Sequence, residues 1–159
     1  MRRTIAAGTA LIAAVLLPPG AGAQTGGEAC AQKLDAQLRR FSEQCVKDLV
    51  AFTASLPKGE ARIASEKDKY YVRILRTENG LQGETVSKQN FPFLKPETET
   101  ALKALGWTPP DVEFGGFKRI FAEPEVRSGS AALDVVKALQ AYGIGPGEAV
   151  SVTVSEAEK

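Results

Sequence analysis

The sequence contains no histidine, and this absence excludes several kinds of active site. Pairs of serine or cysteine with histidine are excluded as nucleophiles, and so are the commonest zinc sites. The only two cysteines, Cys30 and Cys45, are too few for a four-cysteine metal site. Catalysis by carboxylates alone stays open, with Glu84 and either Asp111 or Glu113 as a candidate pair. Nothing in the sequence places such a pair in an apolar setting, so we expect no enzyme and no bound metal or cofactor.

A surplus of basic residues is also missing. Residues 1–23 contain Arg2 and Arg3 and no acidic residue, so without them the 20 basic residues fall to 18, against 19 acidic ones. The resulting net charge of −1 gives no basic surface for a nucleic-acid backbone. We therefore expect no nucleic acid among the partners.

The longest apolar run near the start of the chain is too short to span a membrane. Residues 5–17 give about 13 apolar positions, whereas a spanning helix needs about 20. Arg2 and Arg3 precede the run and small residues end at Ala23, an order typical of a secretory signal peptide. We expect cleavage after Ala23, a flexible leader over residues 24–29, and a periplasmic or secreted protein without a membrane anchor. The paired arginines leave the export route open.

A long helix is predicted over residues 30–56, which contain neither glycine nor proline. Its apolar residues recur at spacings of three and four and therefore share one stripe. They are Cys30, Leu34, Leu38, Phe41, Cys45, Leu49, Phe52 and Leu56. The stripe indicates either a core-facing surface or a helix-to-helix seam in a homodimer.

Both cysteines lie on this stripe. An exported chain with two cysteines favours a disulfide between Cys30 and Cys45. Fifteen residues of straight helix span about 22 Å, whereas the Cα atoms of bridged cysteines lie within about 7 Å of each other. A bridge within one chain therefore requires a helix that begins late or is broken. The alternatives are a bridge between two chains and two separate thiols.

A β-hairpin is predicted around Asn79 and Gly80, because Asn-Gly between two strand-like runs favours a tight turn. Aromatic and β-branched residues alternate over residues 70–76, and residues 81–88 form the returning strand. Gly83 indicates a weak point or a bulge in that strand.

Further elements on both sides of the hairpin complete one predicted domain over residues 30–155, followed by a polar tail over residues 156–159. They are a strand over residues 60–65, a helix that begins at Pro96 and stops before Gly106, a strand over residues 117–121, a helix from Ser128 or Ser130 to Tyr142, and a strand over residues 150–154. Phe91, Phe93 and Leu94 are expected to cover the core, with a binding site as the alternative. We predict an α+β fold with an antiparallel or mixed sheet of about five strands, helices on one face and the long helix first.

Several segments, taken together, point to a known group of proteins. YYVRIL, GETVSK, LGW followed by two prolines, FKR and AALDVVKALQAYG occur in this order before the closing valine strand. Over about residues 69–154 the chain resembles the TY-Chap domains, a group related to type III secretion chaperones and YbjN proteins, most specifically in residues 105–109. The resemblance implies a peptide-binding or chaperone-like module, often dimeric, without catalytic residues. The export signal, the two cysteines and Lys88 after Ser87 depart from the family.

Two classes of function follow from these observations. The first is an exported, non-catalytic binding module, chaperone-like, that holds a peptide or protein segment on an exposed sheet face or at a sheet edge. The residues predicted for this surface are Tyr71, Arg73, Trp107, Phe117 and Arg119. For each of them packing or a solvated strand face is the alternative, and for Trp107 core packing is favoured. The second class is an exported carboxylate enzyme, such as one that cleaves glycans, and a structural envelope or oligomer protein is a further alternative.

Overall fold

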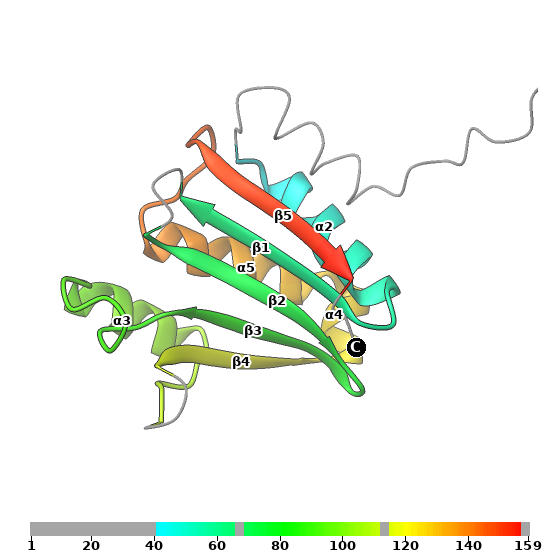
Figure 1. Ribbon diagram of the computed structural model, residues 1–159, viewed down its shortest axis with the longest axis horizontal. Helices are drawn as coiled ribbons and strands as arrows, with labels where there is room; N and C mark the ends of the chain where they lie inside the picture. Colours follow the sequence, from blue (N-terminus) through cyan, green and yellow to red (C-terminus); the bar gives the residue numbers. More distant parts are fainter. Residues whose placement is uncertain (1–40, 66–68, 112–114, 157–159) are drawn as a thin grey trace, which may run out of the picture.

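The computed structural model describes residues 41–65, 69–111 and 115–156, which form a five-stranded antiparallel sheet and four helices (Figure 1). The strand order is β4-β3-β2-β1-β5, and every neighbouring pair is antiparallel. The elements in chain order are α2 (Glu43–Ser55), β1 (Gly59–Ser65), β2 (Tyr71–Thr77), β3 (Gly80–Val86), α3 (Pro96–Ala104), β4 (Gly116–Ala122), α4 (Glu123–Ser128), α5 (Ser130–Ala141) and β5 (Val150–Glu156). The predicted α+β fold class is confirmed.

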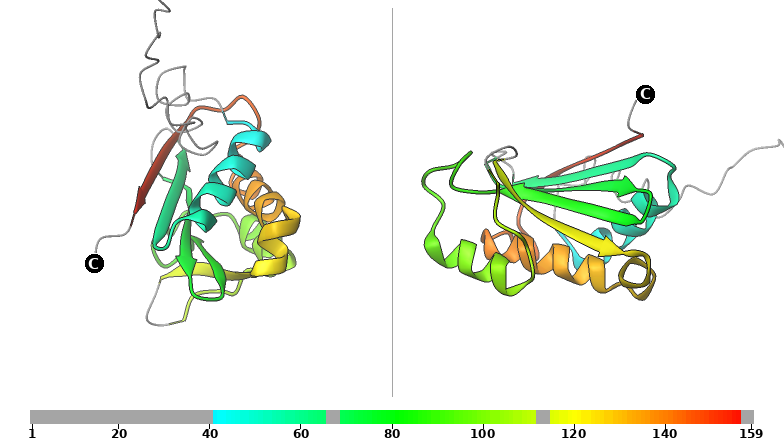
Figure 2. Two further views of the ribbon diagram at one scale, coloured as in Figure 1. Left: turned by 90° about the vertical axis from the view of Figure 1, so that its right-hand side faces the viewer. Right: turned by 90° about the horizontal axis from the view of Figure 1, so that it is seen from below.

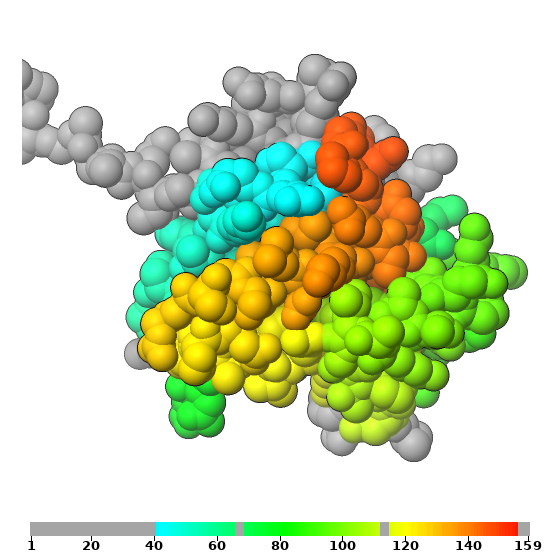
Figure 3. Space-filling model, turned by 180° about the vertical axis from the view of Figure 1, so that it is seen from behind, coloured from blue at the N-terminus to red at the C-terminus, as the bar shows by residue number. Residues whose placement is uncertain are grey.

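The molecule has two layers, with the helices on one face of the sheet (Figure 2). From the helix side, α2, α5 and α4 form a continuous cover and α3 lies beside α5 (Figure 3). The core lies between the layers and includes the fully buried side chains of Leu49, Ile63, Ile74 and Leu139. We call the opposite face of the sheet the open face.

The long helix predicted over residues 30–56 is confirmed for Glu43–Ser55, but it is wrong as one uninterrupted helix. Ser42 is extended, with φ −139° and ψ 147°, and its hydroxyl accepts a hydrogen bond from the Cys45 N–H at 3.2 Å. Serine suits this position because its side chain satisfies an amide that the first helical turn leaves without a partner. The rest of the predicted helix, the signal peptide and the leader lie outside the described residues.

The apolar stripe of α2 faces the core, since Cys45 and Leu49 are buried there. The core-facing interpretation of the stripe is thereby confirmed for this helix. Cys45 is disulfide-bonded. Cys30, the only other cysteine of the sequence, lies outside the described residues. Their pairing, within a chain or between chains, stays a prediction.

The β2–β3 hairpin forms as predicted, but its turn lies one residue earlier than the Asn-Gly signal suggests. Thr77 pairs with Gly80, so the two loop residues are Glu78 and Asn79. Gly80 opens β3 with φ 141°, and a Cβ at this position would collide with the carbonyl oxygen of Phe121. The glycine is therefore required by the close approach of β4 as well as by the turn.

The predicted bulge at Gly83 is absent, because this residue pairs regularly with Ile74 on one side and Arg119 on the other. A Cβ at Gly83 would lie only 2.7 Å from Trp107 Cη2. The glycine therefore makes room for the indole ring.

The second half of the chain follows the predicted order, with one additional element. The short helix α4 was not predicted, although Pro124 lies in its first turn and the Glu125 carboxylate accepts a hydrogen bond from the Ala122 N–H at 2.8 Å. Both features are typical of helix starts. Gly129, with φ 80°, separates α4 from α5.

Candidate binding site

The five residues predicted to form a binding surface do not lie together. Tyr71 and Arg73 lie on the open face of β2. Trp107 and Phe117 are each only 1% exposed and belong to the core, so their assignment to a surface was wrong. Arg119 lies on the helix side of β4, which separates it from Tyr71 and Arg73.

Arg119 lies inside because it shares a strand face with Phe117 and Phe121, and the two phenylalanines decide which face is buried. Its Nη2 contacts Asp134 Oδ2 at 2.7 Å and Glu125 Oε1 at 3.3 Å. The guanidinium also stacks over the Phe121 ring, 5.0 Å from the centroid. Arg119 thus ties α4 and α5 to β4.

The charges on the open face compensate one another. The Arg73 guanidinium donates to both carboxylate oxygens of Glu60 at 2.8 Å, and Glu84 lies 3.4 Å away on the other side. The hydrogen bond from Arg73 lowers the pKa of the Glu60 carboxyl. Arg62 lies over the Tyr71 ring at 4.6 Å. The charges of these residues are therefore paired, and together they form no patch of one sign.

Of the carboxylates considered for catalysis, the structure describes Glu84 and Asp111. Glu84 lies on the open face, where it accepts hydrogen bonds from Gln82 at 2.9 Å and from Arg73. Asp111 is exposed in the segment after α3, and Glu113 lies outside the described residues. Within the described ranges, no group of three or more histidine, cysteine, aspartate or glutamate residues is arranged to hold a metal ion.

Four aromatic rings from three distant segments form a continuous row at one end of the sheet. The ring of Tyr70, just before β2, stacks on that of Tyr142 at the end of α5, with centroids 5.2 Å apart and planes at 23°. Phe91 meets Tyr70 edge to face at 5.2 Å, and Phe93 meets Phe91 at 6.1 Å. We call Tyr70, Tyr142, Phe91 and Phe93 the aromatic row.

The inner end of the aromatic row is fixed by Tyr142. Its hydroxyl donates to the carbonyl oxygen of Val86 at 2.5 Å and accepts from Thr85 Oγ1 at 3.0 Å. Burial of the phenol raises the pKa of Tyr142. The ring is therefore held neutral and in one orientation beneath β3.

The outer end of the aromatic row is Phe93, whose side chain is 84% exposed. The expectation that Phe91, Phe93 and Leu94 cover the core is confirmed for Leu94 and Phe91, but it was wrong for Phe93. The reason is a turn in which the Leu94 N–H donates to the Phe91 carbonyl oxygen at 3.0 Å. Phe93 lies at the corner of this turn, so its ring points outward, whereas Leu94 is buried and Phe91 packs against the core.

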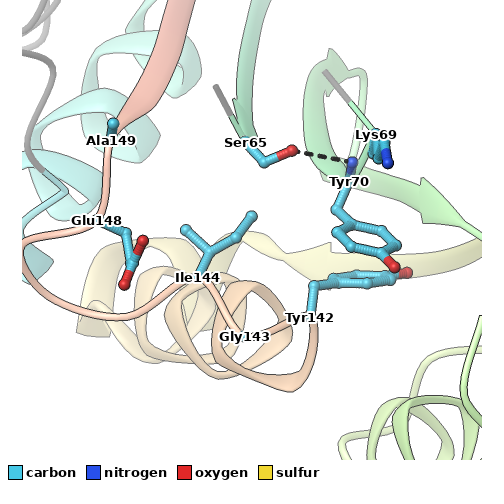
Figure 4. A pocket seen from close by; sticks show the side chains of 8 residues that line it. All are labelled: Ser65, Lys69, Tyr70, Tyr142, Gly143, Ile144, Glu148 and Ala149. Atoms are coloured by element: carbon cyan, nitrogen blue, oxygen red, sulfur yellow. Dashed lines mark hydrogen bonds between the residues drawn. The ribbon is translucent and has the colours of Figure 1, made fainter. Parts of the chain in front are cut away.

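A pocket of about 280 Å³ adjoins the inner part of the row (Figure 4). It lies between the end of β1, the start of β2, the end of α5 and the approach to β5, and its lining residues are Ser65, Lys69, Tyr70, Tyr142, Gly143, Ile144, Glu148 and Ala149. Tyr70, Tyr142 and Ile144 give it an apolar wall, while the exposed side chains of Lys69 and Glu148 carry opposite charges. Ligand sites for whole small molecules start at about 300 Å³, so this pocket suits a single side chain.

The sequence did not predict that the four rings of the aromatic row lie together, because the three segments that contribute them are far apart in the chain. The one local signal was Pro92 between Phe91 and Phe93, because proline favours a turn and apolar residues flank it.

Comparisons with protein-family models, curated proteins and solved structures found no match to this chain. The resemblance to TY-Chap domains therefore rests on the sequence motifs alone. Among the described residues, no helix is both long enough and apolar enough to cross a membrane.

Proposed function

We propose that this chain is a non-catalytic binding domain that recognises an extended segment of a peptide or protein partner through the aromatic row and the adjoining pocket. One observation carries the proposal: Phe93 exposes 84% of a large apolar side chain at the end of a row of rings that leads into the core. Burying a phenylalanine side chain is worth about 1.5–3 kcal/mol. A partner that covers Phe93 would recover part of this free energy.

The chemistry of the site favours an apolar side chain flanked by peptide backbone. The pocket of about 280 Å³ has room for one such side chain against Tyr70 and Ile144. An aromatic side chain on the partner would gain about 0.5–1.5 kcal/mol from packing against these rings beyond its area burial. Lys69 and Glu148 balance each other at the rim, so neither sign of charge is required of the partner.

Two other surfaces of the described residues fit this role less well. A wider hollow of about 550 Å³ at the opposite end of the sheet is lined by the end of α2 and the β2–β3 turn and contains no aromatic side chain. The open face carries charges that already satisfy one another. The resemblance to TY-Chap domains agrees with a chaperone-like role in which a segment is held without being altered.

The proposal is tested by selecting a displayed library of random dodecapeptides on the purified protein. We expect the enriched peptides to share an apolar or aromatic position. Phe93→Ala should weaken their binding at least tenfold, which corresponds to about 1.4 kcal/mol. The matched control is Ile120→Ala, because Ile120 is also a large exposed apolar residue, 60% exposed, but lies on the open face of β4. A selection without enrichment, or equal losses in both variants, would overturn the proposal.

A further inference from the structure

The two edge strands of the sheet, β4 and β5, differ in whether another segment pairs with their outer side. The outer edge of β4 is met by Thr108, which exchanges two backbone hydrogen bonds with Lys118 at 2.7 and 3.0 Å. Within the described part of the chain, no segment pairs with the outer edge of β5, whose only strand neighbour is β1. An edge strand in this state has backbone N–H and C=O groups directed at its surroundings.

β5 carries few of the features that usually protect an edge strand. It is seven residues long and pairs regularly with β1 from Val150 to Glu156, without a bulge. Its sequence, VSVTVSE, contains no proline and no lysine, and its only charged residue, Glu156, is the last residue of the strand. Natural edge strands are usually shortened, twisted by bulges or charged to prevent pairing. The edge of β5 is therefore suited to accept another strand.

The pattern of β5 is symmetric about its centre, Thr153. In an antiparallel pair of two such strands centred on this residue, Val152 faces Val154 of the second copy and Ser151 faces Ser155 of the second copy. Cross-strand partners share a sheet face, so valine meets valine on the helix side and serine meets serine on the open side. The only ionisable residue in the strand, Glu156, lies opposite Val150. No like charges are opposed.

We propose that two copies of this chain pair through β5 about a two-fold axis at Thr153 and form one continuous ten-stranded sheet. The apolar stripe of α2 is already used in the core of its own chain, so a homodimer needs a different surface, and the self-complementary edge provides it. The helices of both copies lie on the same side of the joined sheet. This inference does not depend on the aromatic row.

The mass in solution, measured by light scattering, gives the first test. We expect the wild-type protein to have twice the mass of one chain. Thr153→Lys should raise the dimer dissociation constant at least tenfold, because it places two ammonium groups directly opposite each other. Thr153 is exposed on the open face, so the variant should keep the circular dichroism spectrum of the wild type. A monomeric wild type, or a Thr153→Lys variant as dimeric as the wild type, would overturn the proposal.

A crosslinking experiment tests the register without weakening the edge. Thr153→Cys places the new cysteine opposite its own copy, where Cβ atoms about 4.5–5.5 Å apart approach disulfide range. Ser155→Cys is the matched control, because its cross-strand partner is Ser151 and not itself. Under mild oxidation, we expect a covalent dimer with Thr153→Cys and none above the wild-type level with Ser155→Cys. Equal crosslinking of both variants, or none in either, would contradict the register.

Discussion

Two aromatic clusters lie on the helix side of the same sheet, and only one of them is closed. In the closed cluster, the rings of Trp107 and Phe121 meet edge to face at 6.0 Å, and both residues are at most 1% exposed. Arg119 lies over the Phe121 ring and is itself held by acidic residues of α4 and α5. In the aromatic row, the inner ring is fixed by hydrogen bonds but the outer ring, Phe93, has no cover over 84% of its side chain.

The closed cluster contributes to the stability of the fold, whereas the aromatic row is available for recognition. The closed cluster needs Gly83 beneath it, a position where any side chain would strike the indole ring. Such a fit leaves no space for a ligand and contributes to folding. The aromatic row adjoins a pocket and ends in an exposed ring. A substitution at its outer end should therefore cost the fold little stability.

The largest effect is expected from Trp107→Ala in the closed cluster. Removal of a fully buried tryptophan side chain should lower the free energy of unfolding by about 3–5 kcal/mol, since it leaves a cavity next to Gly83 and Phe121. Phe93→Ala, at the exposed end of the row, should change it by no more than about 0.5 kcal/mol. Urea unfolding followed by circular dichroism measures both. Similar losses of unfolding free energy in the two variants would contradict the difference in burial between the two clusters.

A smaller loss is expected from Asp134→Asn, which removes the charge paired with Arg119 at the rim of the closed cluster. Both side chains are only 17–18% exposed, so the hydrogen bond to a charged partner should be worth about 1.5–3 kcal/mol. Glu60→Gln on the open face is the control. Its partner Arg73 is 37% exposed, so the loss there should stay below about 1 kcal/mol. Urea unfolding in low and high salt compares them, and a larger loss for Glu60→Gln would contradict the account.

A further loss of about this size, and one that depends on pH, is expected at Tyr142, the inner end of the aromatic row. Tyr142→Phe removes the hydrogen bonds with Val86 and Thr85 and should cost about 1 kcal/mol at neutral pH. Burial raises the pKa of Tyr142, so the folded protein keeps this proton at pH values where the unfolded chain releases it. The stabilisation is therefore complete below about pH 10, the pKa of an unperturbed tyrosine, and declines as the pH rises above it.

Urea unfolding of the wild type and Tyr142→Phe at pH 7, 9 and 11 tests this sign. The stability advantage of the wild type should be constant between pH 7 and 9 and smaller at pH 11. An advantage that is unchanged or larger at pH 11 would show that the phenol is not buried in the folded protein.

Most of the architecture could be predicted from local sequence signals. The alternation in residues 70–76 and 150–154 predicted strands, and Pro96 and Gly106 marked both ends of α3, because backbone chemistry acts over a few residues. Periodicity also placed the buried stripe of α2. It could not show that the helix begins after Ser42, since a serine within an apolar-periodic run is compatible with either a cap or a solvent-exposed helical position.

The site could be predicted only in part, because residues distant in sequence build it. The alternation in β4 put Arg119 on the same face as Phe117 and Phe121, but the sequence did not reveal that this face is the buried one. The sequence also did not show that acidic residues of α4 and α5 form ion pairs with Arg119 there. The aromatic row likewise depends on contacts between segments that the sheet brings together.

The measurement that tests the central claim most directly is the mapping of a library-selected peptide onto the nitrogen-15-labelled protein by amide chemical shifts. We predict that the shifts concentrate in residues 69–71, 91–94 and 142–149, which surround the aromatic row and its pocket. Shifts confined to the open face, around Glu60, Arg73 and Ile120, would contradict the claim. In that case the peptide would bind the sheet itself, and the exposed ring of Phe93 would have no part in recognition.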